Sequence, residues 1–405
     1  MRSGEGTVTD HVCQADRVVH IKGRKLRNHK ISTNRGSGNQ LSVNFGGYSF
    51  VMVYNFNAGP SILPQEVYDE ASKAILNFNE TGLSILEIGH RTPAFESVMQ
   101  EAISLTKELM QLGPDKEVMF LHGGATTQFF QVPMNFLDAQ GVAAYLDAGI
   151  WGSKAAREAS LYGHAEVIAS SSDRQYTYIP KGFKVPSDAS YLHVTTNNTV
   201  EGTQMWHFPD VDVPLVADMS SDILSREMDF NRFSLIYAGA QKNIGAAGVC
   251  MVVADRSFIR RKVRKLPSMM DYEKHIENGS MLNTPPVFAV YVCLLTLRWL
   301  KSKGGIKGIE DENRRKSSLL YDTLDALPQF RPTVAKEDRS QMNVVFVMDD
   351  PEAEKDFLAQ CDKECMVGVK GHRSVGGFRV SLYNAMPFES VKVLTDLMCH
   401  FAGKH

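Results

Sequence analysis

The sequence predicts an α/β fold: a large domain with a mostly parallel sheet of about seven strands between helices, and a smaller C-terminal α+β domain. Three observations predict it. Apolar strands alternate with helices from residue 117 onward, and this alternation becomes shorter past residue 255. The length of 405 residues is sufficient for two domains.

The first elements follow from turn residues and apolar spacing. Residues 54–64 form an extended entry with a Gly-Pro turn, and an amphipathic helix is expected over 65–78. A short strand at 84–88 and a longer helix at 93–112 come next.

The alternating part builds the sheet, because parallel strands need helical crossovers. Helices are expected at about 126–137 and 151–162. Strands are expected at 117–123, 142–149, 165–170, 191–195, 214–218, 235–238 and 249–253. Ligands of such sheets bind at the carboxyl ends of the strands.

The C-terminal part has its own pattern. Helices are expected at 257–265, 286–303, 308–327, 351–362 and 388–402, and strands at 343–348 and 377–383. We therefore predict a large domain over 65–312 and a small domain made of 53–64 and 313–405.

Residues 1–52 differ from the rest. Their first 50 residues hold eight Lys and Arg against three Asp and Glu, without an apolar period. We expect either a disordered extension or a misassigned start, since Met52 directly precedes the first apolar segment. An organelle transit peptide is an alternative, which Glu5, Asp10 and Asp16 weaken. The predicted location is the cytoplasm.

Composition excludes several classes of function. A net charge of −2 provides no global field for nucleic acid or an anionic membrane. The six cysteines lack CxxC spacing, so neither a disulfide framework nor a metal site is predicted. The longest apolar run, residues 287–297, is too short to span a bilayer and predicts a buried helix.

The central motif is the turn between two apolar strands, which reads AGAQKNIGAAG and contains Lys242. Small residues around a lysine at a strand end let its amine approach a planar ligand. Schiff-base formation needs such a lysine, partly desolvated and with a lowered pKa. The alternative is a solvated turn lysine.

Two further strand ends carry candidate groups. In GGATTQF the amides of Ala125 and Thr126 would begin a helix and receive a phosphate, although a helix merely capped by Thr is the alternative. Asp218 closes an apolar strand, where a carboxylate is costly unless it meets a cation such as a protonated ring nitrogen. Its alternative role is to cap the Ser220–Ser221 turn. Trp151 offers a stacking face, or belongs to the core.

The basic residues gather in two places, at His90–Arg91 and in the segment 370–387 that holds His372, Arg373 and Arg379. Arg379 lies within an apolar strand, where an inward arginine usually faces a carboxylate or phosphate. An outward-facing edge arginine is the alternative.

Together these candidate groups match a pyridoxal phosphate site. They provide an amine, a partner for the ring nitrogen, a stacking face, a phosphate cradle and a carboxylate clamp. From residue 54 to the C-terminus the chain resembles the phosphoserine aminotransferases, fold-type I enzymes of the class-V aminotransferase family. The resemblance is carried by FNAGPSILP, the His-Arg pair, GGATTQF, AGIWG, NNTVEGTQ, ADMSSDILSR, YAGAQKNIGAAG, LNTPP and GHRSVGGFRVSLYNAMP.

The resemblance implies a role for each matching residue. Lys242 would hold pyridoxal phosphate covalently, Asp218 would pair with its ring nitrogen, Trp151 would stack on the ring and Thr199 would bond the ring hydroxyl. The residues implied for the phosphate are Ala125, Thr126 and Gln241, with Asn283 and Thr284 from a partner subunit. The resemblance therefore implies a homodimer with shared sites.

The implied substrates are L-glutamate and 3-phosphohydroxypyruvate, converted to 2-oxoglutarate and O-phospho-L-serine in serine biosynthesis. Arg379 would bind the α-carboxylate, and the distal anion would meet His372, Arg373 and the partner's His90 and Arg91. Some relatives have a basic residue where this chain has Thr126, so no substrate contact is carried over to that loop.

Other functions stay open. A phosphorylated four-carbon oxo acid of vitamin B6 biosynthesis, 3-hydroxy-2-oxo-4-phosphooxybutanoate, is a possible second substrate. The alternatives are another class-V aminotransferase of the alanine–glyoxylate or serine type and, more remotely, a non-catalytic nucleotide-binding module.

Overall fold

The structure, a computed structural model, describes residues 43–45, 48–50 and 53–403. Strands β1 (Val43–Phe45) and β2 (Tyr48–Phe50) form an antiparallel pair. The rest of the segment 1–52 lies outside the described residues, so the expected disorder there stays a prediction.

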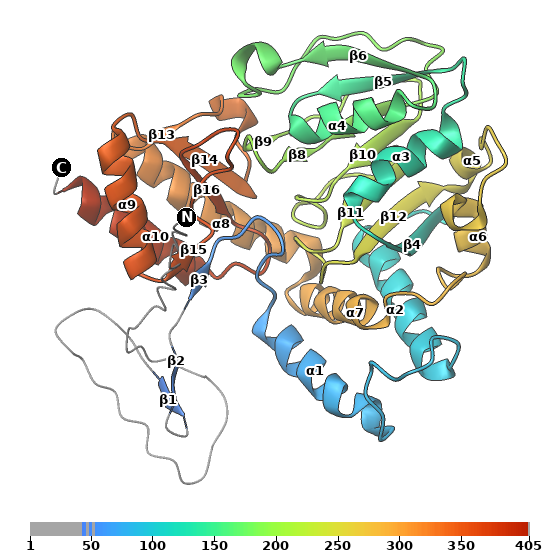
Figure 1. Cartoon of the computed structure of the whole chain (residues 1–405), viewed down its shortest axis with the longest axis horizontal. Helices are drawn as coiled ribbons and strands as arrows, with labels where there is room; N and C mark the ends of the chain where they lie inside the picture. Colours follow the sequence, from blue (N-terminus) through green and yellow to red (C-terminus); the bar gives the residue numbers. More distant parts are fainter. Residues whose placement is uncertain (1–42, 46–47, 51–52, 404–405) are drawn as a thin grey trace, which may run out of the picture.

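A seven-stranded sheet forms the centre of the large domain (Figure 1), with the order β4-β12-β11-β10-β7-β5-β6. β12 runs antiparallel to both of its neighbours, whereas the pairs from β11 to β6 are parallel. The predicted mostly parallel sheet is thus confirmed. Its strands are β4 (Lys116–His122), β5 (Val142–Asp147), β6 (His164–Ser170), β7 (Leu192–Thr195), β10 (Leu215–Asp218), β11 (Leu235–Gly239) and β12 (Val249–Asp255).

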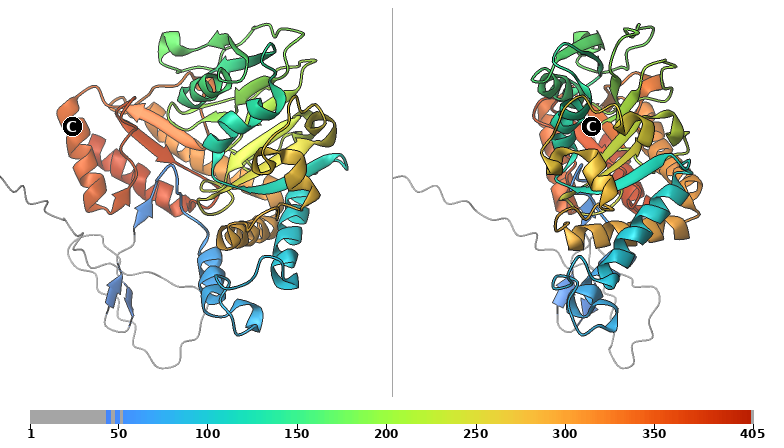
Figure 2. Two further views of the ribbon diagram at one scale, coloured as in Figure 1. Left: turned by 45° about the vertical axis from the view of Figure 1, so that its right-hand side comes forward. Right: turned by 90° about the vertical axis from the view of Figure 1, so that its right-hand side faces the viewer.

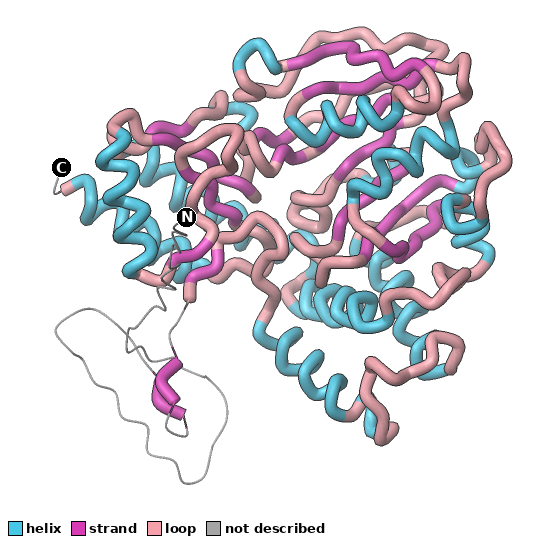
Figure 3. Tube along the Cα trace, in the orientation of Figure 1, coloured by secondary structure: helices cyan, strands magenta, loops and turns pink. Residues whose placement is uncertain are grey.

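Helices cover both faces of this sheet, because successive strand residues point to opposite sides. Phe120 belongs to the core under α2 (Pro93–Leu109) and α7 (Val287–Ser302). Its neighbour Leu121 belongs to the core under α3 (Ala125–Phe136) and α4 (Ile150–Ala159). Figure 3 shows the strands enclosed by these helices.

Two local predictions are wrong. Residues 84–88 form a turn and not a strand, because their buried side chains, Ile85 and Ile88, are three residues apart and not two. The helix expected over 257–265 ends early as α5 (Arg256–Ile259). Beyond it, Lys262 forms ion pairs with Asp271 and Glu273.

The remaining elements of the large domain are short or peripheral. Helix α1 lies at one end of the molecule in Figures 1 and 2, where it contacts α7. These elements are α1 (Gln65–Leu76), η1 (Phe78–Glu80), η2 (Ser172–Arg174), β8 (Asn197–Asn198), β9 (Thr203–Gln204), η3 (Phe230–Arg232), η4 (Ser268–Met270) and α6 (Tyr272–Glu277).

The smaller domain has a separate aromatic core that includes Phe346, Phe357 and Phe378. Its antiparallel sheet has the order β13-β14-β16, and β3 pairs with β15 in parallel. Its elements are β3 (Tyr54–Asn55), α8 (Gly305–Ala326), β13 (Arg331–Pro332), η5 (Lys336–Asp338), β14 (Asn343–Val347), α9 (Pro351–Lys363), β15 (Met366–Val367), β16 (Phe378–Ser381) and α10 (Phe388–Ala402).

Helix α8 runs through the domain boundary expected at residue 312, and the exact boundaries stay predictions. Among the described residues, no helix combines the length and the apolar character needed to cross a bilayer. Helix α7, which contains the apolar run 287–297, is instead buried against α2 and α1.

Candidate active site

One cavity collects the carboxyl ends of the central strands, because β4, β5, β7, β10 and β11 point the same way. Its volume is about 120 Å³. The residues that line it are Gly124, Ala125, Thr126, Phe129, Trp151, Thr195, Asn197, Thr199, Asp218, Ser220, Ser221, Gln241 and Lys242. They include seven of the nine residues predicted to bind the cofactor.

Lys242 lies in the turn that follows β11, and its Nζ donates to Thr199 Oγ1 at 2.7 Å. Desolvation in the cavity lowers the pKa of this amine to about 8, although the carboxylate of Asp218 acts in the opposite direction. The entry segment braces the turn, since Ser61 Oγ donates to the Lys242 carbonyl at 2.6 Å. A lysine with this pKa is poised for nucleophilic attack near neutral pH.

Asp218 ends β10 and is buried on the wall of the same cavity. Its Oδ1 accepts a bond from the Ser220 amide at 2.9 Å, so it also holds the turn as the alternative predicted. Burial raises the pKa of this carboxyl group, while the nearby Lys242 charge lowers it. The site therefore contains an anchored carboxylate that a cationic ring nitrogen would stabilise.

The start of α3 provides an anion cradle. Its N-cap residue is Gly124, so no side chain at this position caps the first helical amides. A Cβ at Gly239 would lie 2.8 Å from Gln241 Oε1 and 3.4 Å from the Ala125 amide nitrogen. Only glycine at 239 lets the Gln241 side chain and the Ala125 amide approach the backbone this closely. The helix amides and the Gln241 side chain thus offer hydrogen-bond donors on one wall of the cavity, which suits a phosphate group.

The aromatic wall comes from the start of α4. Trp151 packs against Phe129, with ring centroids 6.4 Å apart, and Lys154 Nζ lies 4.4 Å from the Trp151 ring centroid. The buried atoms Trp151 Nε1 and Thr195 Oγ1 have no hydrogen-bond partner among the described residues. These groups together are suited to bind pyridoxal phosphate. They comprise an aromatic face, unpaired polar atoms, an anion cradle, a carboxylate and a reactive amine.

Arg379 reaches this region from β16 of the small domain, where it lies opposite Val345 on β14. Directly opposite residues of a strand pair share one face of the sheet, and Val345 packs against Gly202, so the Arg379 side chain lies on the face toward the large domain. Its positive charge contributes to the lowered pKa of Lys242, although Arg379 is not among the residues that line the cavity. Burial lowers the pKa of Arg379, and its Nε has no partner among the described residues. It is a desolvated cation suited to a carboxylate.

His372 and Arg373 precede β16, the first half-buried and the second exposed. His372 Nδ1 lies 2.7 Å from Ser374 Oγ. Burial, followed by the charges of Arg379, Arg373 and Lys154, lowers the pKa of His372. The positive charges of Arg379, Arg373 and Lys154 thus act on His372 and favour its neutral form.

Seven predicted site residues do not line the cavity: Arg379, His372 and Arg373, described above, and four others. His90 and Arg91 lie in the turn before α2, and the Asn283 side chain is 3.4 Å from His122 Nδ1 at the end of β4. The lining of the cavity includes none of these four residues, His90, Arg91, Asn283 and Thr284. Their contribution from a second subunit stays a prediction.

Several residues at the site carried no functional prediction. Lys154 is one helical turn from Trp151, a spacing that sequence could have indicated. Ser220 Oγ accepts a bond from the Gly239 amide at 3.1 Å and thereby joins two strand ends. Glu201 lies inside the NNTVEGTQ motif, but only the fold shows what it faces.

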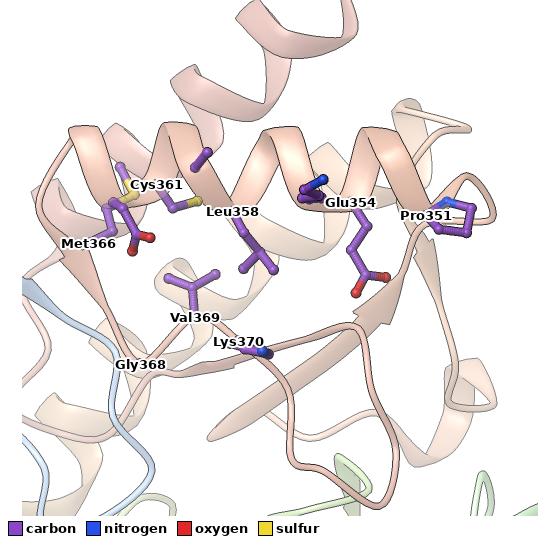
Figure 4. Close-up of a pocket in the computed structure, with 11 residues that line it drawn as sticks. Pro351, Glu354, Leu358, Cys361, Met366, Gly368, Val369 and Lys370 are labelled. Atoms are coloured by element: carbon purple, nitrogen blue, oxygen red, sulfur yellow. The ribbon is translucent and has the colours of Figure 1, made fainter. Parts of the chain in front are cut away.

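A larger cleft lies elsewhere, between α9 and the segment around β15 (Figure 4). Its volume is about 520 Å³, and its lining includes Pro351, Leu358, Val369 and Lys370. It contains no reactive amine beside a buried carboxylate. Choosing the active site by cavity volume alone would therefore miss the groups that can perform chemistry.

Comparison with known proteins agrees with the geometry. Residues 53–394 match the aminotransferase class-V family. The phosphoserine aminotransferase of Flavobacterium johnsoniae is 54% identical over 346 residues, covering 85% of this chain and 97% of that protein.

Two solved structures extend the similarity. The phosphoserine aminotransferase of Bacillus circulans subsp. alkalophilus matches with a TM-score of 0.85 at 43% identity, covering 87% of this chain and 99% of that chain. The PLP-bound phosphoserine aminotransferase of Trichomonas vaginalis matches with a TM-score of 0.82 at 33% identity, covering 86% and 100%. Alike in sequence and in fold, the chain belongs to the phosphoserine aminotransferases of the class-V aminotransferase family.

Proposed function

We propose that the protein uses pyridoxal phosphate to transfer the amino group of L-glutamate to 3-phosphohydroxypyruvate, which gives 2-oxoglutarate and O-phospho-L-serine. The observation that carries this proposal is the shared cavity of Lys242, Asp218 and the α3 N-terminus in a chain of this family. The reaction serves serine biosynthesis, and we place it in the cytoplasm.

When bound, pyridoxal phosphate supplies a sink for the electrons released as the Cα–H bond of the amino acid breaks. Lys242 would hold the cofactor covalently through its amine, and the same amine would move the proton at Cα of the amino acid. Asp218 would hold a proton on the ring nitrogen. The first amides of α3 and the Gln241 side chain would hold the phosphate.

Substrate binding would use the cations at the open side. Arg379 meets the α-carboxylate, because its guanidinium forms two parallel bonds with a planar anion. His372 and Arg373 meet the distal anion, which is a carboxylate in glutamate and a phosphate in the oxo acid. We propose that His90 and Arg91 of a second copy of the chain complete this group in a homodimer.

The rival class-V activities fit less well. An alanine–glyoxylate or serine aminotransferase needs no cations for a distal phosphate, and the 54% identical relative is a phosphoserine aminotransferase. A non-catalytic nucleotide-binding module would leave Lys242, Asp218 and Arg379 without a common purpose.

A coupled assay that compares amino acceptors tests the proposal. With glutamate as donor, kcat/KM for 3-phosphohydroxypyruvate is expected to exceed that for hydroxypyruvate or glyoxylate by at least about a hundredfold, because charge-assisted bonds to the phosphate are lost with the smaller acceptors. The four-carbon 3-hydroxy-2-oxo-4-phosphooxybutanoate is expected to be accepted as well. Equal or faster turnover with glyoxylate would make the chain an aminotransferase of another specificity.

A further inference from the structure

A single turn joins the cavity to the small domain. It comprises residues 199–202 and connects the short strands β8 and β9. At its start Thr199 accepts the bond from Lys242, and at its end the Gly202 carbonyl accepts a bond from the Ser340 amide at 3.0 Å. A Cβ on Gly202 would lie 2.8 Å from Val345, the residue opposite Arg379 in the small sheet.

Glu201 occupies this turn and is almost completely buried, with 5% of its surface exposed. Its Oε1 accepts a bond from the Ile150 amide at 2.8 Å, directly before Trp151. Its Oε2 has no partner among the described residues and lies 2.9 Å from the place of a Cβ at Gly149. The carboxylate is therefore fitted closely against the start of α4.

The charge of Glu201 is not explained by that contact, since a neutral glutamine could accept the same bond. Burial raises the pKa of Glu201, and Asp147 raises it further, so the carboxylate carries a desolvation cost. The nearby Asp147, in contrast, accepts hydrogen bonds from the hydroxyl groups of Ser153, Ser170 and Tyr176.

The cation that offsets this cost is Arg379. Arg379 lies directly opposite Val345, and opposite side chains of a strand pair share one face, so its side chain lies on the face that the 199–202 turn approaches at Gly202. The Coulomb interaction between Glu201 and Arg379 favours the charged form of each group. Glu201 Oε1 is bonded to the Ile150 amide, and Glu201 Oε2 and Arg379 Nε both lack partners among the described residues. The terminal guanidinium nitrogens are thus left for a substrate carboxylate.

We infer that Glu201 is a positioning residue for amino-group transfer: it fixes the Trp151 turn through the Ile150 amide and orients the Arg379 guanidinium toward the α-carboxylate through its charge. The inference rests on the proposed function, in which Arg379 binds that carboxylate. Glu201 touches neither reacting atom, so its effect should appear in carboxylate binding and not in the chemical step.

The test is Glu201→Gln in the protein loaded with pyridoxal phosphate. The probe is maleate, a dicarboxylate that binds without reacting, titrated through the change it causes in the visible spectrum of the cofactor. We expect its dissociation constant to rise about tenfold, the KM values of glutamate and 3-phosphohydroxypyruvate to rise in parallel, and kcat to change less than about threefold. The unbound spectrum and the melting temperature should stay at wild-type values, because the bond to Ile150 is retained.

Two further variants make the result decisive. Glu201→Asp keeps the charge but is too short for the Ile150 amide, so it should bind maleate better than Glu201→Gln while altering the cofactor spectrum through Trp151. Glu352→Gln removes an exposed glutamate of α9 and should behave as wild type.

Unchanged or tighter maleate binding in Glu201→Gln would overturn the inference, because the charge of Glu201 would then not help Arg379 to bind a carboxylate. A joint loss of maleate binding, cofactor spectrum and melting temperature would also overturn it, by showing a purely structural role. Maleate binding needs no turnover. A failed acceptor comparison would therefore refute the substrate assignment separately.

Discussion

Replacement of Lys242 by alanine is expected to lower kcat by more than about a thousandfold, because the residue supplies both the covalent attachment and the proton transfer at Cα. The visible band of the bound cofactor should shift to that of free aldehyde. Coupled turnover and a visible spectrum of the purified variant measure the two effects.

Within the part of the chain that the structure describes, two other lysines with notable surroundings have amines that are engaged elsewhere. The Lys154 amine lies over the Trp151 ring, and Lys316 Nζ donates to the carbonyls of Leu382, Tyr383 and Asn384. Lys184→Ala removes an exposed lysine and serves as the control, with both signals expected to persist. Near-normal turnover in Lys242→Ala would refute its role.

Asp218→Asn is expected to reduce kcat by about a hundred- to a thousandfold, because a neutral amide cannot hold a proton on the ring nitrogen as the reaction places charge on the ring. The fold should persist, since the new side-chain oxygen can still accept the Ser220 amide bond. Burial already disfavours the carboxylate, so the melting temperature of the apoprotein should not fall.

Steady-state kinetics beside a thermal melt separate these effects. Asp188→Asn, at an exposed position, is the matched control. If Asp218→Asn retained wild-type kcat, the carboxylate would be a turn cap and nothing more.

The central sheet was predicted correctly, and seven of the nine cofactor candidates line one cavity, because both depend on local signals. That these residues bind the cofactor stays a prediction. One apolar strand ends in Asp218, and another ends shortly before Trp151. Because these strands run parallel, both residues lie at the same edge of the sheet. The same reasoning failed at 84–88, where Ile85 and Ile88 gave an apolar signal without the period of a strand.

The rest depends on long-range packing. The charges of Glu201 and Arg379 interact only because the turn at 199–202 docks on β14, which no spacing along the chain reveals. His90, Arg91, Asn283 and Thr284 do not line the cavity of one chain, and the pairing of two chains is beyond what a single sequence pattern specifies.

Two lysines with lowered pKa values, Lys242 and Lys316, show why geometry must accompany electrostatics. Burial lowers the pKa of Lys316 to about 7, below the value of about 8 for Lys242. Lys316 nevertheless donates its three hydrogen bonds to backbone carbonyls, whereas Lys242 lines a cavity that contains a carboxylate and an anion cradle. The pKa alone would select the wrong amine.

Reductive trapping tests this assignment most directly. The protein saturated with pyridoxal phosphate is treated with borohydride, digested and mapped by peptide mass spectrometry. We predict one pyridoxyl adduct, on Lys242. An adduct on Lys316 or another lysine, with Lys242 unmodified, would contradict the assignment of the reactive amine and the site built around it.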